Sequence, residues 1–290
     1  MKPALLCVAL LCLLSLIFSS LPAHAQGKLE KFEKEVKNES SKSDDHDDEK
    51  GNKSAKGDNH GGYHNDDLWV EVIYDIVNSD HSGPFFKGLV SGAWPTEWQI
   101  HNPYFWTASY AAYPYAVPRK GRFLHTGGKR SAVNMTGHYF HESKALHGYS
   151  LWSRFSASPF LNIETHITGM TEKIGTDDDY LVFYDVYVNY LRVRHENVVF
   201  WYGAGMKSMQ QGDDSYHGPA MTTGLEIYAG RPVSLYCMIN IGRLNAQAVR
   251  ETQMRMNLHL NRALFYAGYQ RFAVGRVAMN GVVFGAGIYF

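Results

Sequence analysis

The stretch that decides the fold is Val233-Ser234-Leu235-Tyr236-Cys237-Met238-Ile239-Asn240-Ile241, and the same pattern returns in Thr252-Gln253-Met254-Arg255-Met256-Asn257-Leu258-His259-Leu260. In both stretches an apolar residue falls on nearly every second position. Successive side chains of a β-strand point to opposite faces of the sheet, so each stretch would have one apolar face. In the second stretch the opposite face is fully polar and partly ionisable. Both stretches therefore predict strands whose two faces meet different surroundings.

From about Ala132 to the last residue, the sequence divides into segments of about ten residues that alternate in polarity and are separated by turn residues. No segment is long enough to be a membrane helix. The pattern predicts an all-β fold, with residues 131–290 forming a transmembrane antiparallel up-and-down β-barrel of about ten strands. Twelve strands are an alternative, because Tyr104–Tyr115 and Gly121–Thr126 could pair as another hairpin, and eight are a further one. The spacing alone also fits a soluble sandwich.

The N-terminus predicts export. Lys2 precedes an apolar run from Ala4 to Leu21, and Ala23-His24-Ala25 follows as an A-x-A cleavage site, so residues 1–25 are expected to be a signal peptide. Removal of the signal takes two of the three cysteines with it. Cys237 alone can form neither an internal disulfide nor a thiolate cluster, and no metal or cofactor is expected.

The last strand carries a resemblance. The residues Asn280-Gly281-Val282-Val283-Phe284-Gly285-Ala286-Gly287-Ile288-Tyr289-Phe290 resemble the C-terminal strand of bacterial outer-membrane β-barrels, with Gly285, Ile288 and Phe290 at the matching positions. Ile288 replaces a more usual aromatic residue, and Val283 stands where a polar residue is common. The resemblance implies a cell outer membrane location and a signal for the barrel-insertion machinery. Outer-membrane lipid and lipopolysaccharide would then be the surroundings of the barrel.

The connections between the expected strands differ in length. Those at 157–160, 194–197, 230–232 and 261–262 are short, and those at 141–147, 172–179, 210–219 and 244–249 are longer and more polar. Outer-membrane barrels have short periplasmic turns and longer external loops, so Phe290 is placed on the periplasmic side. The external loops are expected to meet a partner that no motif names.

Ionisable residues fall on the polar face of the expected strands. Charge at the lipid midplane would cost about 2–4 kcal/mol for Arg or Lys, so these residues should point into the barrel. The predicted lumen network consists of Arg154, Glu164, His166, Asp185, Glu226, Arg255 and His259, with His138 beside them. A filled lumen with a structural or interaction role is the preferred interpretation. A narrow small-solute channel is the alternative.

A lipid-acting hydrolase is a second alternative. His141-Glu142-Ser143 resembles the His-x-Ser of outer-membrane phospholipase A, and His141 could deprotonate Ser143 for attack on an ester. Lys144-Ala145 departs from that family's Asn-Gly, and no asparagine follows to orient the imidazole. The sequence therefore favours a protein that is not an enzyme.

Two segments precede the expected barrel. Residues 26–67 are rich in Lys, Glu, Asp, Ser, Asn and Gly and are expected to be a disordered leader. Residues 68–130 are dense in aromatics and proline and are expected to be a plug, a cap or extra strands. The charge of the whole chain balances to zero, and no basic cluster is interleaved with aromatics, so nucleic acid is not an expected partner.

Overall fold

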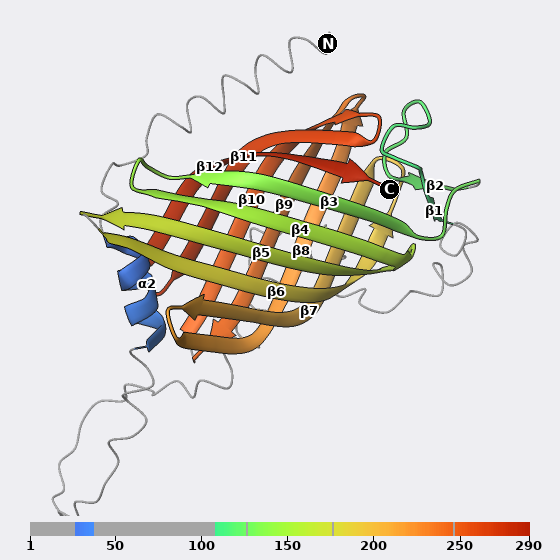
Figure 1. The fold of residues 1–290 in the computed structure, drawn as a ribbon. Coiled ribbons are helices and arrows are strands. Elements are labelled where there is room, and N and C mark those ends of the chain that lie inside the picture. Colours follow the sequence, from blue (N-terminus) through green and yellow to red (C-terminus); the bar gives the residue numbers. More distant parts are fainter. Residues whose placement is uncertain (1–26, 38–107, 126, 176, 246) are drawn as a thin grey trace, which may run out of the picture.

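The structure is a computed structural model that describes residues 27–37, 108–125, 127–175, 177–245 and 247–290. The predicted signal peptide lies outside the described residues, as do most of the leader and most of the aromatic segment. Strands β3 to β12 form one closed antiparallel barrel in which each strand pairs with the next along the chain and β12 pairs with β3 (Figure 1). The prediction of a ten-stranded up-and-down barrel is confirmed.

The ten barrel strands are β3 (Ala132–His141), β4 (Leu146–Ser158), β5 (Leu161–Ile174), β6 (Asp177–Arg194), β7 (Val198–Gln211), β8 (Asp214–Gly230), β9 (Val233–Leu244), β10 (Gln247–Leu260), β11 (Ala263–Val274) and β12 (Val277–Tyr289). Two short strands precede them, β1 (Ser109–Tyr110) and β2 (Phe123–Leu124), which pair with each other in a separate sheet. The hairpin that suggested twelve strands therefore forms, but it stays outside the barrel.

The two faces of the wall differ in polarity as the alternation predicts. On β10, Gln253, Arg255 and Asn257 are buried in the interior, whereas Met254 and Leu258 are exposed on the outside. Large apolar side chains cover the outer face of the other strands in the same way. A soluble barrel has the opposite arrangement, so this is the polarity of a barrel that meets lipid.

Three of the four expected long loops are not present, and the fourth, between β3 and β4, has only four residues (142–145), so the prediction of long loops was wrong. Two residues connect β5 to β6, β7 to β8, β9 to β10 and β11 to β12, and the strands continue through the polar stretches instead. Gly175, Gly212, Asn245 and Gly275 begin these turns with φ between 48° and 66°, a left-handed conformation that suits tight hairpin turns. β6 reaches 18 residues, more than the 9–11 that cross a bilayer. Turn length therefore does not distinguish the two mouths of the barrel.

The two mouths are covered by different parts of the chain. Helix α2 (Lys28–Lys37) lies at the mouth formed by the turns after β3, β5, β7, β9 and β11, and β1 and β2 lie at the other mouth, near Phe290 (Figure 1). The prediction of disorder is therefore wrong for these ten residues of the leader. In the part of the chain that the structure describes, no helix has the length and apolar character needed to span a bilayer.

Candidate functional site

The centre of the barrel holds a buried lysine between two carboxylates. Lys207 Nζ on β7 lies 2.5 Å from Asp185 Oδ2 on β6 and 3.4 Å from Glu251 Oε2 on β10. Lys207 is 0% exposed and each carboxylate-bearing residue is 2% exposed. Gln270 Nε2 and Asn240 Nδ2 also donate to the Glu251 carboxylate, at 2.8 and 3.2 Å. We call Lys207, Asp185 and Glu251 the central ion cluster.

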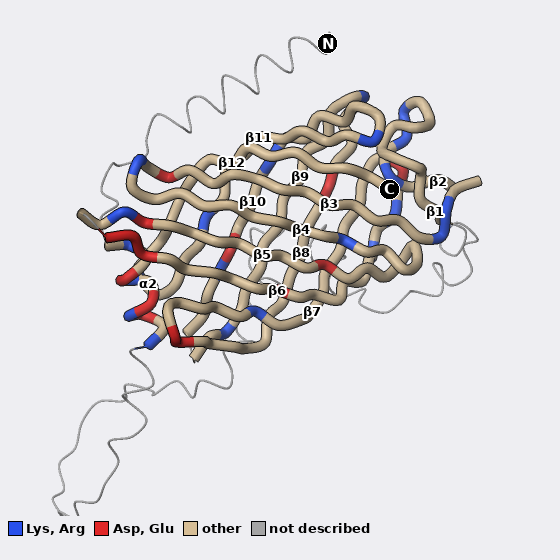
Figure 2. The backbone as a smooth tube through the Cα atoms, in the orientation of Figure 1, with Lys and Arg blue, Asp and Glu red and all other residues tan. Residues whose placement is uncertain are grey.

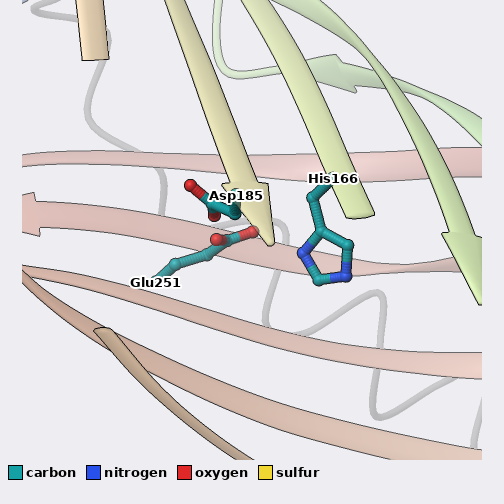
Figure 3. Close-up of side chains that lie close together, drawn as sticks. All are labelled: His166, Asp185 and Glu251. Carbon is teal, nitrogen blue, oxygen red and sulfur yellow. The ribbon is translucent and has the colours of Figure 1, made fainter. Parts of the chain in front are cut away.

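His166 on β5 lies beside this cluster (Figure 3). One ligand atom each of His166, Asp185 and Glu251 lies within 4.8 Å of the others, a set that could hold a divalent cation. The Lys207 ammonium, however, already supplies a positive charge to both carboxylates. The His166 ring stacks on Trp152 at 4.1 Å between centroids. These contacts fit an ion-paired core and do not require a bound metal.

A second layer of the interior pairs Arg154 on β4 with Glu164 on β5. The Arg154 Nε donates to Glu164 Oε1, and the guanidinium lies 4.8 Å above the ring of Trp201. Arg255 on β10 lies over the rings of Tyr236 and Tyr266, at 4.1 and 4.3 Å from their centroids. Cation–π contacts of this kind stabilise a guanidinium that has been removed from water. Both arginines of this layer therefore have partners within the barrel.

Glu226 and His259 form a third group, toward the β1–β2 mouth. Ser234 Oγ donates to Glu226 Oε1 at 2.9 Å and lies 2.9 Å from His259 Nε2. Asn257 Nδ2 and the hydroxyl of Tyr228 also donate to the Glu226 carboxylate, at 3.2 and 2.9 Å. His138 on β3 lies in the same interior but nearer the α2 mouth, with Nδ1 3.1 Å from the Tyr266 hydroxyl.

The structure thus places every residue of the predicted lumen network in the interior and brings it against neighbours from adjacent strands. The cavity lined by Arg154, Glu164, His166, Trp152 and Arg255 has a volume of about 20 Å³. That is enough for about one water molecule. In the described residues, this layer therefore holds charged and aromatic side chains in direct contact around a small cavity.

The α2 mouth is closed by apolar contacts. Leu29, Phe32 and Val36 share one face of α2, are fully buried, and pack on inward-facing residues near the strand ends. The Phe32 ring meets Phe183 edge-on at 5.8 Å. Because an amphipathic helix of ten residues is marginal alone, this burial is what holds it in place. We call Lys28–Lys37 the α2 plug.

Polar contacts fix the plug at both of its ends. At the N-terminus the Leu29 amide donates to Glu172 Oε2 at 2.7 Å, and Lys28 Nζ pairs with Glu142 Oε1 at 2.7 Å. A carboxylate at this end also complements the helix dipole. At the C-terminus, Lys37 Nζ lies 2.6 Å from Asp214 Oδ2, and the hydrogen bonds from Lys37 to Asp214 and Glu33 raise the pKa of the Lys37 amine.

The other mouth is covered by the segment that contains β1 and β2. Tyr110 donates its hydroxyl to the Ser158 carbonyl at 2.9 Å, and Tyr115 donates to the Val233 carbonyl at 2.5 Å. Burial raises the pKa of Tyr115 to about 12. Arg122 reaches Ser156 Oγ at 3.0 Å. The described part of the aromatic segment is therefore a cap that contacts several strand ends.

The residues of the hydrolase alternative are not brought together. Ser143 Oγ accepts hydrogen bonds from the amides of Ala145 and Leu146, at 3.2 and 3.1 Å, within the turn between β3 and β4. The ring of His141 stacks on Tyr139 at 6.0 Å. Among the described residues, no hydrogen bond joins His141 to Ser143. The geometry is that of a turn serine and an outward-facing histidine.

The residues of the expected insertion signal lie along β12. Ile288 and Phe290 are exposed on the outer face, and the Phe290 amide donates to the Val133 carbonyl at 2.9 Å. A side chain at Gly285 would come within 2.6 Å of the Tyr266 ring and the Gly137 carbonyl, so glycine is required for this close approach.

Three features escaped the sequence analysis. The side chains of Lys207 and Glu251 point inward by the same alternation as the predicted residues. Extending that alternation along β7 and β10 would have predicted both. The α2 plug has apolar residues at positions 29, 32 and 36, which is the i, i+3, i+7 spacing of a helix face. That signal was present inside a composition that otherwise predicts disorder.

Comparisons with known proteins identify no family for this chain. No family model and no curated protein matches the sequence. Among solved structures, the attachment invasion locus protein Ail of Yersinia pestis is 12% identical, covering 55% of this chain and 98% of its own with a TM-score of 0.30. The N-terminal β-barrel domain of OprF of Pseudomonas aeruginosa is 10% identical, covering 57% and 100%, with a TM-score of 0.28. OmpT of Vibrio cholerae is 10% identical, covering 53% and 64%, with a TM-score of 0.30.

Proposed function

We propose that this chain is an integral outer-membrane protein whose barrel is sealed and whose role is structural or interactive, carried by the ends of the barrel and not by a pore. The observation that carries the proposal is that both mouths are occupied by the chain's own segments while the interior between them is ion-paired and packed. Barrels that leave a wide aqueous channel have nearer sixteen strands.

The α2 mouth offers the more distinctive surface for a partner. Asp177, Asp178 and Asp179 of β6 lie at this mouth, next to the exposed face of α2, and Figure 2 shows acidic residues gathered on α2 and the adjoining strand ends. Because the turns are tight, a partner would contact long strand ends and a helix, and not flexible loops. Insertion with Phe290 in the periplasm would place this mouth at the cell exterior.

Conductance in planar bilayers tests the sealed barrel. The full chain should give no steady current, and neither should a variant lacking residues 28–37, because the Arg154 and Lys207 layers lie below the plug. Arg154→Gln with Glu164→Gln, which keeps a hydrogen-bonding pair while removing both charges, serves as the matched interior variant. A steady current in the wild type whose ion selectivity changes in this double variant would contradict the proposal and establish the channel alternative.

A further inference from the structure

The outer wall beside the α2 mouth contains a hollow of about 440 Å³. It is formed by the ends of β10 and β11 and is lined by Gln247, Ala248, Arg250, Thr252, Arg271, Ala273 and Gly275. A volume of this size is within the range of small-molecule sites. We call it the outer basic groove.

The groove presents two arginines on one face. Arg271 pairs across the ladder with Thr252, and Arg250 pairs with Ala273, so the two arginines are diagonal neighbours on adjacent strands. Both side chains are exposed. Within the described residues, neither guanidinium lies within ion-pair distance of a carboxylate. Their hydrogen-bonding capacity is therefore available to a ligand, with the Thr252 hydroxyl between them.

The position of the groove relative to the apolar outer face determines which part of the membrane a bound ligand contacts. Two residues further from the α2 mouth, on the same face, Met254 pairs with Tyr269, and Met254 is 57% exposed on the apolar outer face. Phe265 and Leu258 continue this apolar belt. The arginines thus lie where the apolar belt ends. The proposed insertion would place them at the level of the lipid headgroups, where a cationic side chain is tolerated far better than at the bilayer midplane.

We propose that the outer basic groove binds the phosphate-bearing headgroup of lipopolysaccharide. Two guanidinium groups match a headgroup with two phosphates, because the planar fork of arginine donates two parallel hydrogen bonds to phosphate oxygens. The acyl chains would then lie along the apolar belt below. This inference rests on the proposed outer-membrane insertion, with the α2 mouth in the outer leaflet.

One acidic group bounds the site. The Glu35 carboxylate of α2 lies against Gly275, at the edge of the groove. It repels a bound phosphate without contacting the arginines. Glu35→Gln should therefore strengthen binding of the phosphate-bearing headgroup, an effect that nonspecific adsorption of lipid to the protein would not produce.

Native mass spectrometry of the detergent-solubilised full chain with lipid A measures the binding. Arg250→Gln with Arg271→Gln should weaken it by at least about tenfold, since a hydrogen bond to a charged group contributes about 1.5–3 kcal/mol. The matched control is Arg231→Gln with Arg262→Gln, which removes two exposed arginines from turns at the opposite mouth. Dephosphorylated lipid A should bind the wild type as weakly as lipid A binds the Arg250 and Arg271 variant.

Three results would overturn the proposal: equal binding by the two double variants, equal binding of lipid A with and without its phosphates, or phosphatidylglycerol binding as tightly as lipid A. The last would show a site for any lipid phosphate. Heat modifiability and outer-membrane fractionation of each variant separate the two proposals. If the barrel is inserted but binds lipid A and the comparison lipids equally well, only the lipid site is refuted. If the chain is absent from the outer membrane, the proposed function is refuted.

Discussion

Replacing Lys207 with methionine should destabilise the barrel by about 3–5 kcal/mol, the usual cost of removing one partner from a buried ion pair. The ammonium is fully buried, 2.5 Å from Asp185 and 3.4 Å from Glu251. Its loss leaves two neighbouring carboxylates without a counter-charge. Glu251 keeps two hydrogen bonds, from Gln270 and Asn240, whereas Asp185 keeps only a longer one of 3.3 Å from the Tyr187 hydroxyl, so the uncompensated charge falls mainly on Asp185.

A double variant tests whether the unpaired charge on Asp185 causes the loss of stability. If the cost arises from the unpaired charge, Asp185→Asn should remove much of it, and the Lys207→Met, Asp185→Asn double variant should be more stable than the sum of the single effects predicts. Lys144→Met in the exposed turn after β3 is the control, because it removes the same charge from the surface. The difference of 3–5 kcal/mol corresponds to a change of about two to three and a half powers of ten in the unfolding equilibrium.

Guanidinium unfolding in detergent, followed by tryptophan fluorescence and by the heat-modifiable band on a gel, measures these differences. The midpoint should fall for Lys207→Met, recover in part for the double variant, and stay unchanged for Lys144→Met. Strict additivity of the two single substitutions would refute the reasoning, since it would mean that Lys207 and Asp185 do not interact. So would a Lys207→Met barrel as stable as the wild type.

The remaining predictions concern the plug and the insertion signal. Phe32→Ala should cost about 3–5 kcal/mol of the docking free energy of α2, seen as protease cleavage within α2 while the heat-modifiable barrel persists; an uncut helix would show that its apolar face does not hold it. Glu30→Cys in a Cys237→Ala background should react with a membrane-impermeant maleimide in intact cells, and labelling only after lysis would reverse the proposed orientation. Phe290→Ser should reduce the amount of protein in the outer-membrane fraction, and normal assembly would remove its role as an insertion signal.

The sequence predicted the barrel well because its dominant signal is physical and local. A strand that separates lipid from a polar interior must alternate, and the alternation of Val233–Ile241 and Thr252–Leu260 is nearly unbroken. Strand number, antiparallel order and the inward parity of residues such as Arg154 and Glu226 follow from it. The connections were harder to predict, because the strands extend beyond the thickness of a bilayer and the polar residues at their ends resemble loop residues.

The alternation of inward and outward residues does not predict which interior side chains contact each other. The alternation predicts that Arg255 points inward. It does not predict that the guanidinium lies over the rings of Tyr236 and Tyr266 instead of pairing with a carboxylate. The position of α2 could not be predicted from the sequence for a related reason. Its apolar face predicts a helix, whereas the mouth it occupies is set by residues more than a hundred positions away, among them Glu142 and Glu172.

The interior network also has a consequence for how the strands find their register. A slip of one residue on β7 or β10 would move Lys207 or Arg255 from the interior to the outer face, because the side-chain period of a strand is two. Each such charge at the bilayer midplane would cost about 2–4 kcal/mol, and the carboxylates left inside would lose their partners. A misregistered barrel is therefore penalised on both faces at once. An all-apolar interior would impose no such double penalty, so the paired charges favour this register of the barrel over its neighbours.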